Sequence, residues 1–93
     1  MKIAFDIDGT LINIEGHPYC KPDTPRYEVI ELYRIFEDFE YDIYIWSGGG
    51  LDYAKRWAER LGLDGKIVQK GSFVPDIAID DEEVKLGKIN MKV

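Results

Sequence analysis

Two acidic residues near the start of the chain have the types and the spacing that catalysis requires. Asp6 and Asp8 follow an apolar run at residues 2–5 and precede Gly9 and Thr10. In an extended chain, residues i and i+2 point to the same side, so the two carboxylates could face one substrate. Two like charges this close must be compensated by a cation, a partner base or a proton. The alternative is a simple turn, because Asp-Gly and Gly-Thr pairs commonly end a strand.

A hydroxyl group and three glycines follow a second apolar run, residues 42–46. This run is rich in β-branched and aromatic residues and is therefore predicted to be a strand. Between that strand and a following helix, the backbone N–H groups of Gly48 and Gly49 can approach an anion, and the helix dipole favours it. Ser47, Gly48 and Gly49 are candidate phosphate ligands. The alternative is a merely flexible glycine loop.

Charged residues also follow two later runs. Asp80 and Asp81 come directly after the apolar residues 76–79, whereas the two glutamates after them are expected on a solvated face. Lys70 follows a short predicted strand at residues 66–69, and Lys66 is the alternative lysine. These positions repeat the pattern of the first run, in which polar groups stand where a buried strand ends.

Two helices are predicted between these runs from apolar residues at helical spacing. The first would begin with Thr24 as its N-cap and Pro25 as its first residue, and the second would end at Gly62. Their apolar stripes consist of Val29, Leu32, Tyr33 and Phe36, and of Ala54, Trp57, Ala58 and Leu61. Because strands and helices alternate, the predicted fold is α/β, with a parallel sheet and helices on both faces. A further edge strand is expected near residues 88–92.

Residues 10–21 are predicted to form a hairpin or flap beside the end of the first strand, because Gly16-His17-Pro18 is a turn signal. Such a flap would partly cover a small ligand. His17 is interpreted as a solvated turn residue, with contact to the substrate as the alternative. Cys20 is expected to be a small buried residue and not a nucleophile, because no base or helix start near it would activate the thiol.

The bulk composition narrows the class of protein. A chain of 93 residues is expected to form one domain around a single core. The formal net charge of −6 disfavours nucleic acid and anionic membrane as partners. No apolar stretch approaches the roughly 18 to 20 residues of a spanning helix, and no signal-peptide pattern is present. With one cysteine, a cytoplasmic location is the expectation.

In a parallel sheet, all of these polar groups would come from strand ends on one side and would form one pocket. Oxygen ligands without histidine or cysteine suit Mg²⁺, which takes carboxylates, water and phosphate oxygens. With the metal and Lys70 present, a phosphate monoester could approach the acids. One carboxylate could then attack phosphorus while another protonates the leaving oxygen and later activates water.

These residues resemble the four ordered motifs of the haloacid dehalogenase-like (HAD) superfamily. The resemblance covers residues 1–83 and rests on the Asp-x-Asp-Gly-Thr element, a serine at a strand end, a lysine and an aspartate pair. It implies a Rossmann-like sheet in the strand order 4-1-2-3. The Asp-x-Asp form is similar to that of the Mg²⁺-dependent phosphatases and phosphotransferases of the superfamily. With so short a flap, there is no room for a cap domain.

The resemblance also implies a role for each motif residue. Asp6 would be the nucleophile and a metal ligand, and Asp8 the general acid and base, with its main-chain carbonyl as a further ligand. Asp80 and Asp81 would complete the metal site. Ser47 and Lys70 would hold the phosphoryl group, and Thr10 would assist in binding phosphate.

The expected function is Mg²⁺-dependent hydrolysis of a phosphate monoester through an aspartyl phosphate. The alternatives are phosphoryl transfer to a sugar or nucleoside, and a non-catalytic module that binds a phosphorylated ligand on the same fold. The partner expected in each case is a phosphorylated substrate whose identity the sequence does not specify. A second subunit that covers the open site is a further expectation.

Overall fold

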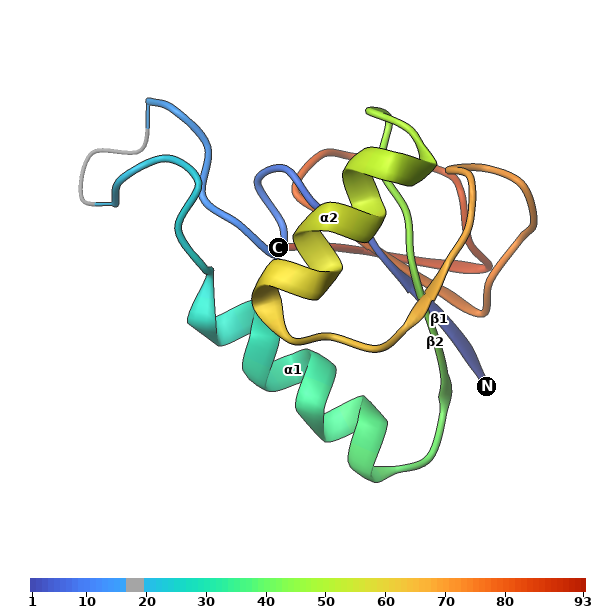
Figure 1. Ribbon diagram of the computed structural model, residues 1–93. Coiled ribbons are helices and arrows are strands. Elements are labelled where there is room, and N and C mark those ends of the chain that lie inside the picture. The colour runs from blue at the N-terminus through green and yellow to red at the C-terminus, as the bar shows by residue number, and fades with distance from the viewer. Residues whose placement is uncertain (17–19) are drawn as a thin grey trace.

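The computed structural model describes residues 1–16 and 20–93, which form one five-stranded sheet and two helices (Figure 1). In chain order the elements are β1 (Lys2–Phe5), α1 (Tyr27–Asp38), β2 (Asp42–Ile45), α2 (Leu51–Leu61), β3 (Lys66–Ile67), β4 (Ile77–Asp80) and β5 (Ile89–Lys92). No helix among these described residues is long and apolar enough to cross a membrane.

The strands form a parallel sheet in the order β3-β2-β1-β4-β5, which confirms the predicted α/β class. Read from the opposite edge, the order is β5-β4-β1-β2-β3. Strand β1 lies in the middle, and its last residue, Phe5, is in register with Ile45 of β2 and Ile79 of β4. The residues that follow these three strands therefore come together at one edge of the sheet.

Both helices cover the same face of the sheet, so the prediction of helices on both faces is wrong. Val29 of α1 and Trp57 of α2 pack with Ile3, Phe5 and Ile43 in one core cluster. The connections from β1 to β2 and from β2 to β3 run in one direction across the sheet, and right-handed crossovers place both helices on one side. The connections that return to β4 and go on to β5 belong on the other side, and neither contains a helix.

Loops cover this second face. Ala4, Trp46 and Ala78 form its buried layer, with Phe73 from residues 68–76 and Leu86 from residues 81–88 packed against them. Because the side chains of Ala4 and Ala78 are small, these loops pack close to the strands and leave no empty space between loop and sheet.

The first helix begins later than predicted. Its preceding residue is Arg26, which makes no side-chain capping bond, and Thr24 is not the N-cap. Thr24 instead accepts a 3.0 Å hydrogen bond from the Nδ2 group of Asn13, and its carbonyl accepts one of 2.8 Å from the Asn13 N–H group. Pro25 forms a bridge with Ile12. Residues 12–13 and 23–25 thus pair as the two arms of the flap, and this pairing uses the groups that would have capped the helix.

The outer part of the flap corrects one prediction. Cys20 is exposed and not buried. Because the flap projects beyond the sheet edge, no packed layer is available to bury the thiol (Figure 1). His17, for which contact with substrate was an alternative, lies outside the described residues.

The other helix and strand boundaries agree with those predicted from the sequence to within a few residues. Helix α2 ends with Gly62 in the left-handed conformation at φ 70°, as its role as a stop signal requires. The expected tail strand is present as β5, and β4 begins one residue later than predicted. Strand β3 contains only Lys66 and Ile67, so the predicted strand at 66–69 is too long.

The tight seating of the loop before β5 can be tested at Gly87. A Cβ atom added there would lie 2.8 Å from the backbone nitrogen of Ala78 and 2.9 Å from the carbonyl oxygen of Ile89. We expect Gly87→Ala to lower the free energy of unfolding by roughly 1–3 kcal/mol in urea titrations, because backbone atoms must move. Gly48→Ala is the matched control, since its added Cβ meets nothing within 4 Å. Equal stabilities of the two variants would contradict this packing.

Candidate functional site

The site is built at the carboxyl ends of the three central strands. Asp6 follows β1 directly, Asp80 is the last residue of β4, and Ser47 lies two residues beyond β2. The Asp6 N–H group donates a 3.1 Å hydrogen bond to the carbonyl oxygen of Ile79, which continues the pairing of β1 with β4 past the last strand residue. The fold therefore brings together residues 74 positions apart, as parallel pairing predicts.

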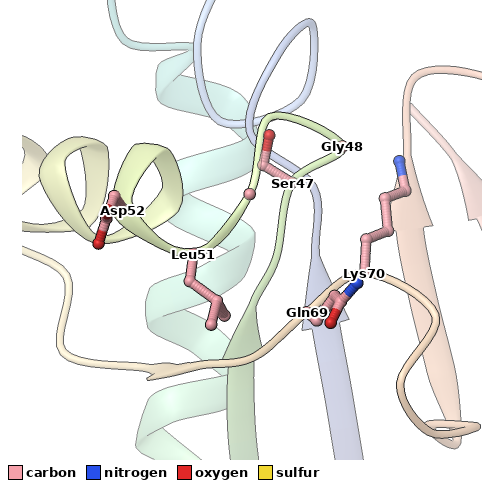
Figure 2. Close-up of a pocket in the computed structure, with 7 residues that line it drawn as sticks. Ser47, Gly48, Leu51, Asp52, Gln69 and Lys70 are labelled. Carbon is pink, nitrogen blue, oxygen red and sulfur yellow. The ribbon is translucent and has the colours of Figure 1, made fainter.

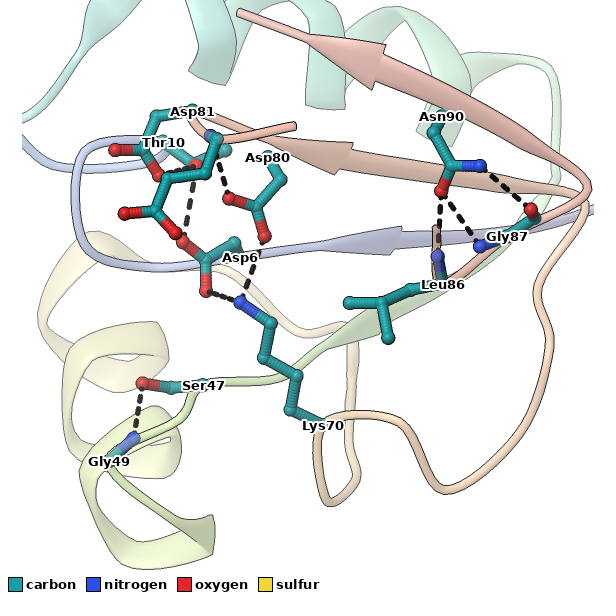
Figure 3. Close-up of polar contacts among 11 residues, drawn as sticks. Asp6, Thr10, Ser47, Gly49, Lys70, Asp80, Asp81, Leu86, Gly87 and Asn90 are labelled. Carbon is teal, nitrogen blue, oxygen red and sulfur yellow. Dashed lines mark hydrogen bonds and ion pairs between the residues drawn. The ribbon is translucent and has the colours of Figure 1, made fainter. Parts of the chain in front are cut away.

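Three carboxylates form the centre of the site. Asp6, Asp80 and Asp81 each offer an oxygen atom, and these atoms lie within 4.8 Å of one another. The ammonium group of Lys70 lies 3.1 Å from Oδ1 of Asp6 and 2.9 Å from Oδ2 of Asp80 (Figure 3). The charge of Lys70 thus faces three acids, and two of them, Asp6 and Asp80, are buried. A group of this kind could hold a metal ion.

Burial and the neighbouring charges shift the pKa values of these groups. Burial, and next the charge of Asp80, raise the pKa of Asp6 from 3.8 to about 6, although the ion pair with Lys70 acts in the opposite direction. Burial and a hydrogen bond with Asp80 likewise raise the pKa of Asp81. Burial alone would lower the pKa of Lys70, but its bonds to Asp80 and Asp6 raise it, so the lysine is charged. A second cation at this point would relieve the remaining repulsion.

A tight loop after β1 holds the carboxylates in place. Thr10 is fully buried, and its hydroxyl group lies 3.3 Å from Oδ2 of Asp6 and 3.4 Å from Oδ1 of Asp81 (Figure 3). Gly9 has a φ of +76°, and a Cβ atom there would overlap the Asp81 carboxylate. Arg26 donates a 2.6 Å hydrogen bond to the Gly9 carbonyl from the base of the flap. Thr10 therefore orients two acids and does not line the cleft, where it was expected to bind phosphate.

The loop after β2 presents a hydroxyl group and backbone N–H groups. Ser47 is buried, and its Oγ atom accepts a 3.0 Å hydrogen bond from the Gly49 N–H group. That bond fixes the Ser47 side chain and leaves its own proton available for an acceptor in the cleft. Gly50 is the N-cap residue of α2, with φ 99°, and it has no side chain to accept a bond from the first N–H groups of the helix. These N–H groups are therefore available to another acceptor.

These groups line one cleft of about 280 Å³. Its lining comprises the predicted site residues Asp6, Asp8, Ser47, Gly48, Gly49, Lys70, Asp80 and Asp81, together with Ile14 and Glu82. A larger cleft of about 450 Å³ adjoins it and shares Ser47, Gly48 and Lys70 (Figure 2). The floor of this second cleft comes from Leu51, Asp52 and Gln69. There is space beside the carboxylates for a bound ligand larger than an ion.

The structure distinguishes the two candidate lysines. The Lys66 ammonium group lies 5.7 Å from the centre of the Tyr44 ring, and Lys66 does not line the cleft. Lys70 reaches the carboxylates because its backbone is part of the loop that crosses from β3 to β4 (Figure 3). The carboxylate group of Asp8 is not part of the acidic cluster.

Asp8 has a partner that the sequence did not indicate. Its Oδ1 atom accepts a 2.5 Å hydrogen bond from the hydroxyl group of Tyr53, in the first turn of α2. Burial, and then the bond to Asp8, raise the pKa of Tyr53 to about 12, so the hydroxyl keeps its proton and remains a donor. Only the position of Tyr53 close behind the glycine loop could have indicated this contact.

No protein-family model, curated protein or solved structure matches this chain. The function is therefore argued from the site itself.

The raised pKa of Asp6 predicts that this carboxylate destabilises the metal-free protein above pH 6. Its ordinary pKa is 3.8 and its pKa in the folded protein is about 6, so the unfolded chain loses this proton first as the pH rises. The penalty is absent below pH 3.8, grows between 3.8 and about 6, and is constant above that. Relative to wild type, Asp6→Asn should gain about 2–3 kcal/mol of unfolding free energy across this interval.

Urea titrations at several pH values in the presence of EDTA measure this difference. Asp42→Asn is the matched control, because Asp42 is exposed and begins β2, at the opposite end of the sheet from the cleft. A wild type that becomes more stable than Asp6→Asn as the pH rises would overturn the assignment.

Proposed function

We propose that this protein is a Mg²⁺-dependent phosphohydrolase that cleaves phosphate monoesters through an aspartyl phosphate. The observation that carries the proposal is the position of Asp6. It directly follows the central strand, contacts Lys70 within the acidic cluster, and lines the same cleft as Ser47. The succession β4-β1-β2-β3 within the sheet and the four motif positions support membership of the HAD superfamily.

The donor set fits a divalent cation. The oxygen atoms come from Asp6, Asp80 and Asp81, with no histidine or cysteine among them, and a cation would offset the burial and the neighbouring charges that raise the pKa values of Asp6 and Asp81. Such hard oxygen donors favour Mg²⁺ over softer metals. When bound, the ion supplies positive charge that lets a phosphate dianion approach and stabilises charge on the phosphoryl group in transfer.

The first half-reaction uses two aspartates. A carboxylate oxygen of Asp6 attacks phosphorus while the bond from phosphorus to the leaving oxygen breaks. The carboxylic acid of Asp8 donates its proton to that oxygen, so the alcohol leaves neutral. This step requires Asp6 ionised and Asp8 protonated.

The second half-reaction reverses the role of Asp8. Its carboxylate accepts a proton from water as the water oxygen attacks phosphorus, and the bond to Asp6 breaks. Inorganic phosphate leaves, Asp6 is again a carboxylate, and Asp8 is again protonated, so protons and charges balance over the cycle. Tyr53 orients Asp8 for both transfers through its hydrogen bond to Oδ1.

Lys70 and the glycine loop hold the phosphoryl group. The Lys70 ammonium group already touches Asp6, so an oxygen on phosphorus near Asp6 lies within its reach. Ser47, with its Oγ atom fixed by Gly49, directs its proton to a second oxygen, and the N–H group of Gly48 can serve a third. These fixed donors stabilise charge without reorganising during the reaction.

Metal binding should stabilise the folded protein. At a Mg²⁺ concentration of about one hundred times the dissociation constant, we expect the wild-type free energy of unfolding to rise by about 2.7 kcal/mol, because only the folded state assembles the three carboxylates. Thermal or urea unfolding with and without MgCl₂ measures the increment. Asp80→Asn should lose it and Asp42→Asn should keep it. An equal increment in both variants would exclude the acidic cluster as the metal site.

Loss of the nucleophile should abolish catalysis. We expect Asp6→Asn to lower the release of phosphate from p-nitrophenyl phosphate by roughly a thousandfold or more, and Asp8→Asn by roughly a hundredfold or more. EDTA should stop the wild-type reaction, and Asp42→Asn should resemble wild type. Release of inorganic phosphate in equal amount to the alcohol separates hydrolysis from transfer to an acceptor. Wild-type turnover by Asp6→Asn, with its fold intact, would refute the mechanism.

A further inference from the structure

A second feature beside the active cleft is a cationic groove on helix α2. Tyr53, Arg56, Trp57 and Arg60 line it, and it encloses about 210 Å³. They stand at positions i, i+3, i+4 and i+7, so they form one stripe along the helix. We refer to this stripe as the arginine groove.

The two arginines of the groove differ from the other arginines of the described chain in lacking an acidic partner. Within residues 1–16 and 20–93, neither Arg56 nor Arg60 forms an ion pair, whereas Arg26 and Arg34 each do. Both guanidinium groups are exposed on a protein whose formal net charge is −6. The Arg60 guanidinium lies 4.8 Å from the centre of the Trp57 ring, which holds it over the buried indole. The groove thus presents two positive charges, one of them positioned by stacking.

Tyr53 connects the groove with the active cleft. Its side chain lines the groove, and its hydroxyl group donates to Asp8, which lines the cleft. In the proposed mechanism Asp8 protonates the leaving oxygen, so the leaving group starts beside Tyr53. Along α2, the Cα atoms of Tyr53 and Arg60 are roughly 10 Å apart. A leaving group the size of a sugar or nucleoside could extend from one to the other.

We propose that the arginine groove binds a second phosphate on the leaving group, so that the substrate is a small bisphosphate. This inference rests on the proposed phosphohydrolase function for the direction of the leaving group. Planar guanidinium groups bind phosphate oxygens in pairs, and two arginines balance one phosphate dianion. The adjoining cleft of Figure 2 suits a second anion poorly, because its described lining contains the Asp52 carboxylate and no cation besides Lys70.

A small molecule fits this groove better than a nucleic acid. Continuous polyanions need a track of basic residues along the surface, and affinity grows with each phosphate that is neutralised. Here the two arginines of the groove are confined to two turns of one helix, and the formal net charge of −6 repels a long polyanion.

Two matched substrate pairs test the proposal. They are adenosine 3′,5′-bisphosphate against adenosine 3′-phosphate, and glucose 1,6-bisphosphate against glucose 6-phosphate. For at least one pair, we expect wild-type kcat/KM to favour the bisphosphate by about tenfold or more, from charge-assisted hydrogen bonds to its second phosphate. In the double variant Arg56→Gln/Arg60→Gln the ratio of the two kcat/KM values should fall to about one. Lys55→Gln is the matched control, since it removes one charge from the same helix outside the groove, and it should keep the ratio.

Equal wild-type kcat/KM values for the two members of each pair would overturn the proposal. So would a ratio that survives in the double variant, or one that Lys55→Gln lowers as much. A 3′-phosphorylated oligonucleotide hydrolysed more efficiently than every bisphosphate would replace the small substrate with a nucleic acid.

Calorimetric binding separates this proposal from the catalytic one. Using Asp6→Asn as background, adenosine 3′,5′-bisphosphate should bind about tenfold more tightly than adenosine 3′-phosphate, and addition of Arg56→Gln/Arg60→Gln should remove the difference. If this difference in affinity is observed but wild type hydrolyses no substrate, the hydrolase proposal is refuted and the phosphate-binding groove is retained. If wild type hydrolyses substrate but the two affinities are equal, the groove proposal is refuted and the hydrolase is retained.

Discussion

The rest of the site depends on one electrostatic constraint, which is that three carboxylates meet at the end of the central strand with Lys70 as the cation between them. Two of these acids are buried, so water cannot screen them fully. The surrounding residues hold this unfavourable arrangement together: Thr10 bridges Asp6 and Asp81, and Gly9 provides the space for the Asp81 carboxylate. Stability is given up locally, as is common where a fold is shaped to bind a charged ligand.

The one-sided covering of the sheet contributes to the same constraint. Because both helices lie on one face, the chain between β3 and β4 crosses the other face as a loop. That loop carries Lys70 to the carboxyl ends of the strands, where it bonds Asp6 and Asp80. The same loop places Phe73 against Trp46, with ring centres 5.7 Å apart, so its path is fixed by packing. The missing helix and the position of the lysine therefore have a common origin.

The sequence predicted the residues of the site better than the elements around it. Asp6 and Asp80 could be found because each ends an apolar run, and burial of that run is a local property of the chain. The face on which a helix packs depends on the order of the strands, which hydrophobic periodicity does not encode. Thr24 has the chemistry of an N-cap, but Asn13 takes its bonding groups from across the flap. Tyr53 was missed for the same reason, because its partner Asp8 is 45 residues away.

Helix α2 connects the glycine loop of Ser47, the hydrogen bond between Tyr53 and Asp8, and the arginine groove, because residues of each lie on the helix or directly before it. Its first residues follow the glycine loop of Ser47, its first turn contains Tyr53, and its next two turns contain Arg56 and Arg60. Ala54, Trp57 and Ala58 of the same helix are buried in the core, which fixes the helix relative to the sheet. The spacing between Tyr53, which bonds Asp8, and the two arginines of the groove is thus set by the rise of a single helix. For the bisphosphate that we propose as substrate, this rigid element would select the distance between the two phosphates, because one would lie in the cleft and the other in the groove.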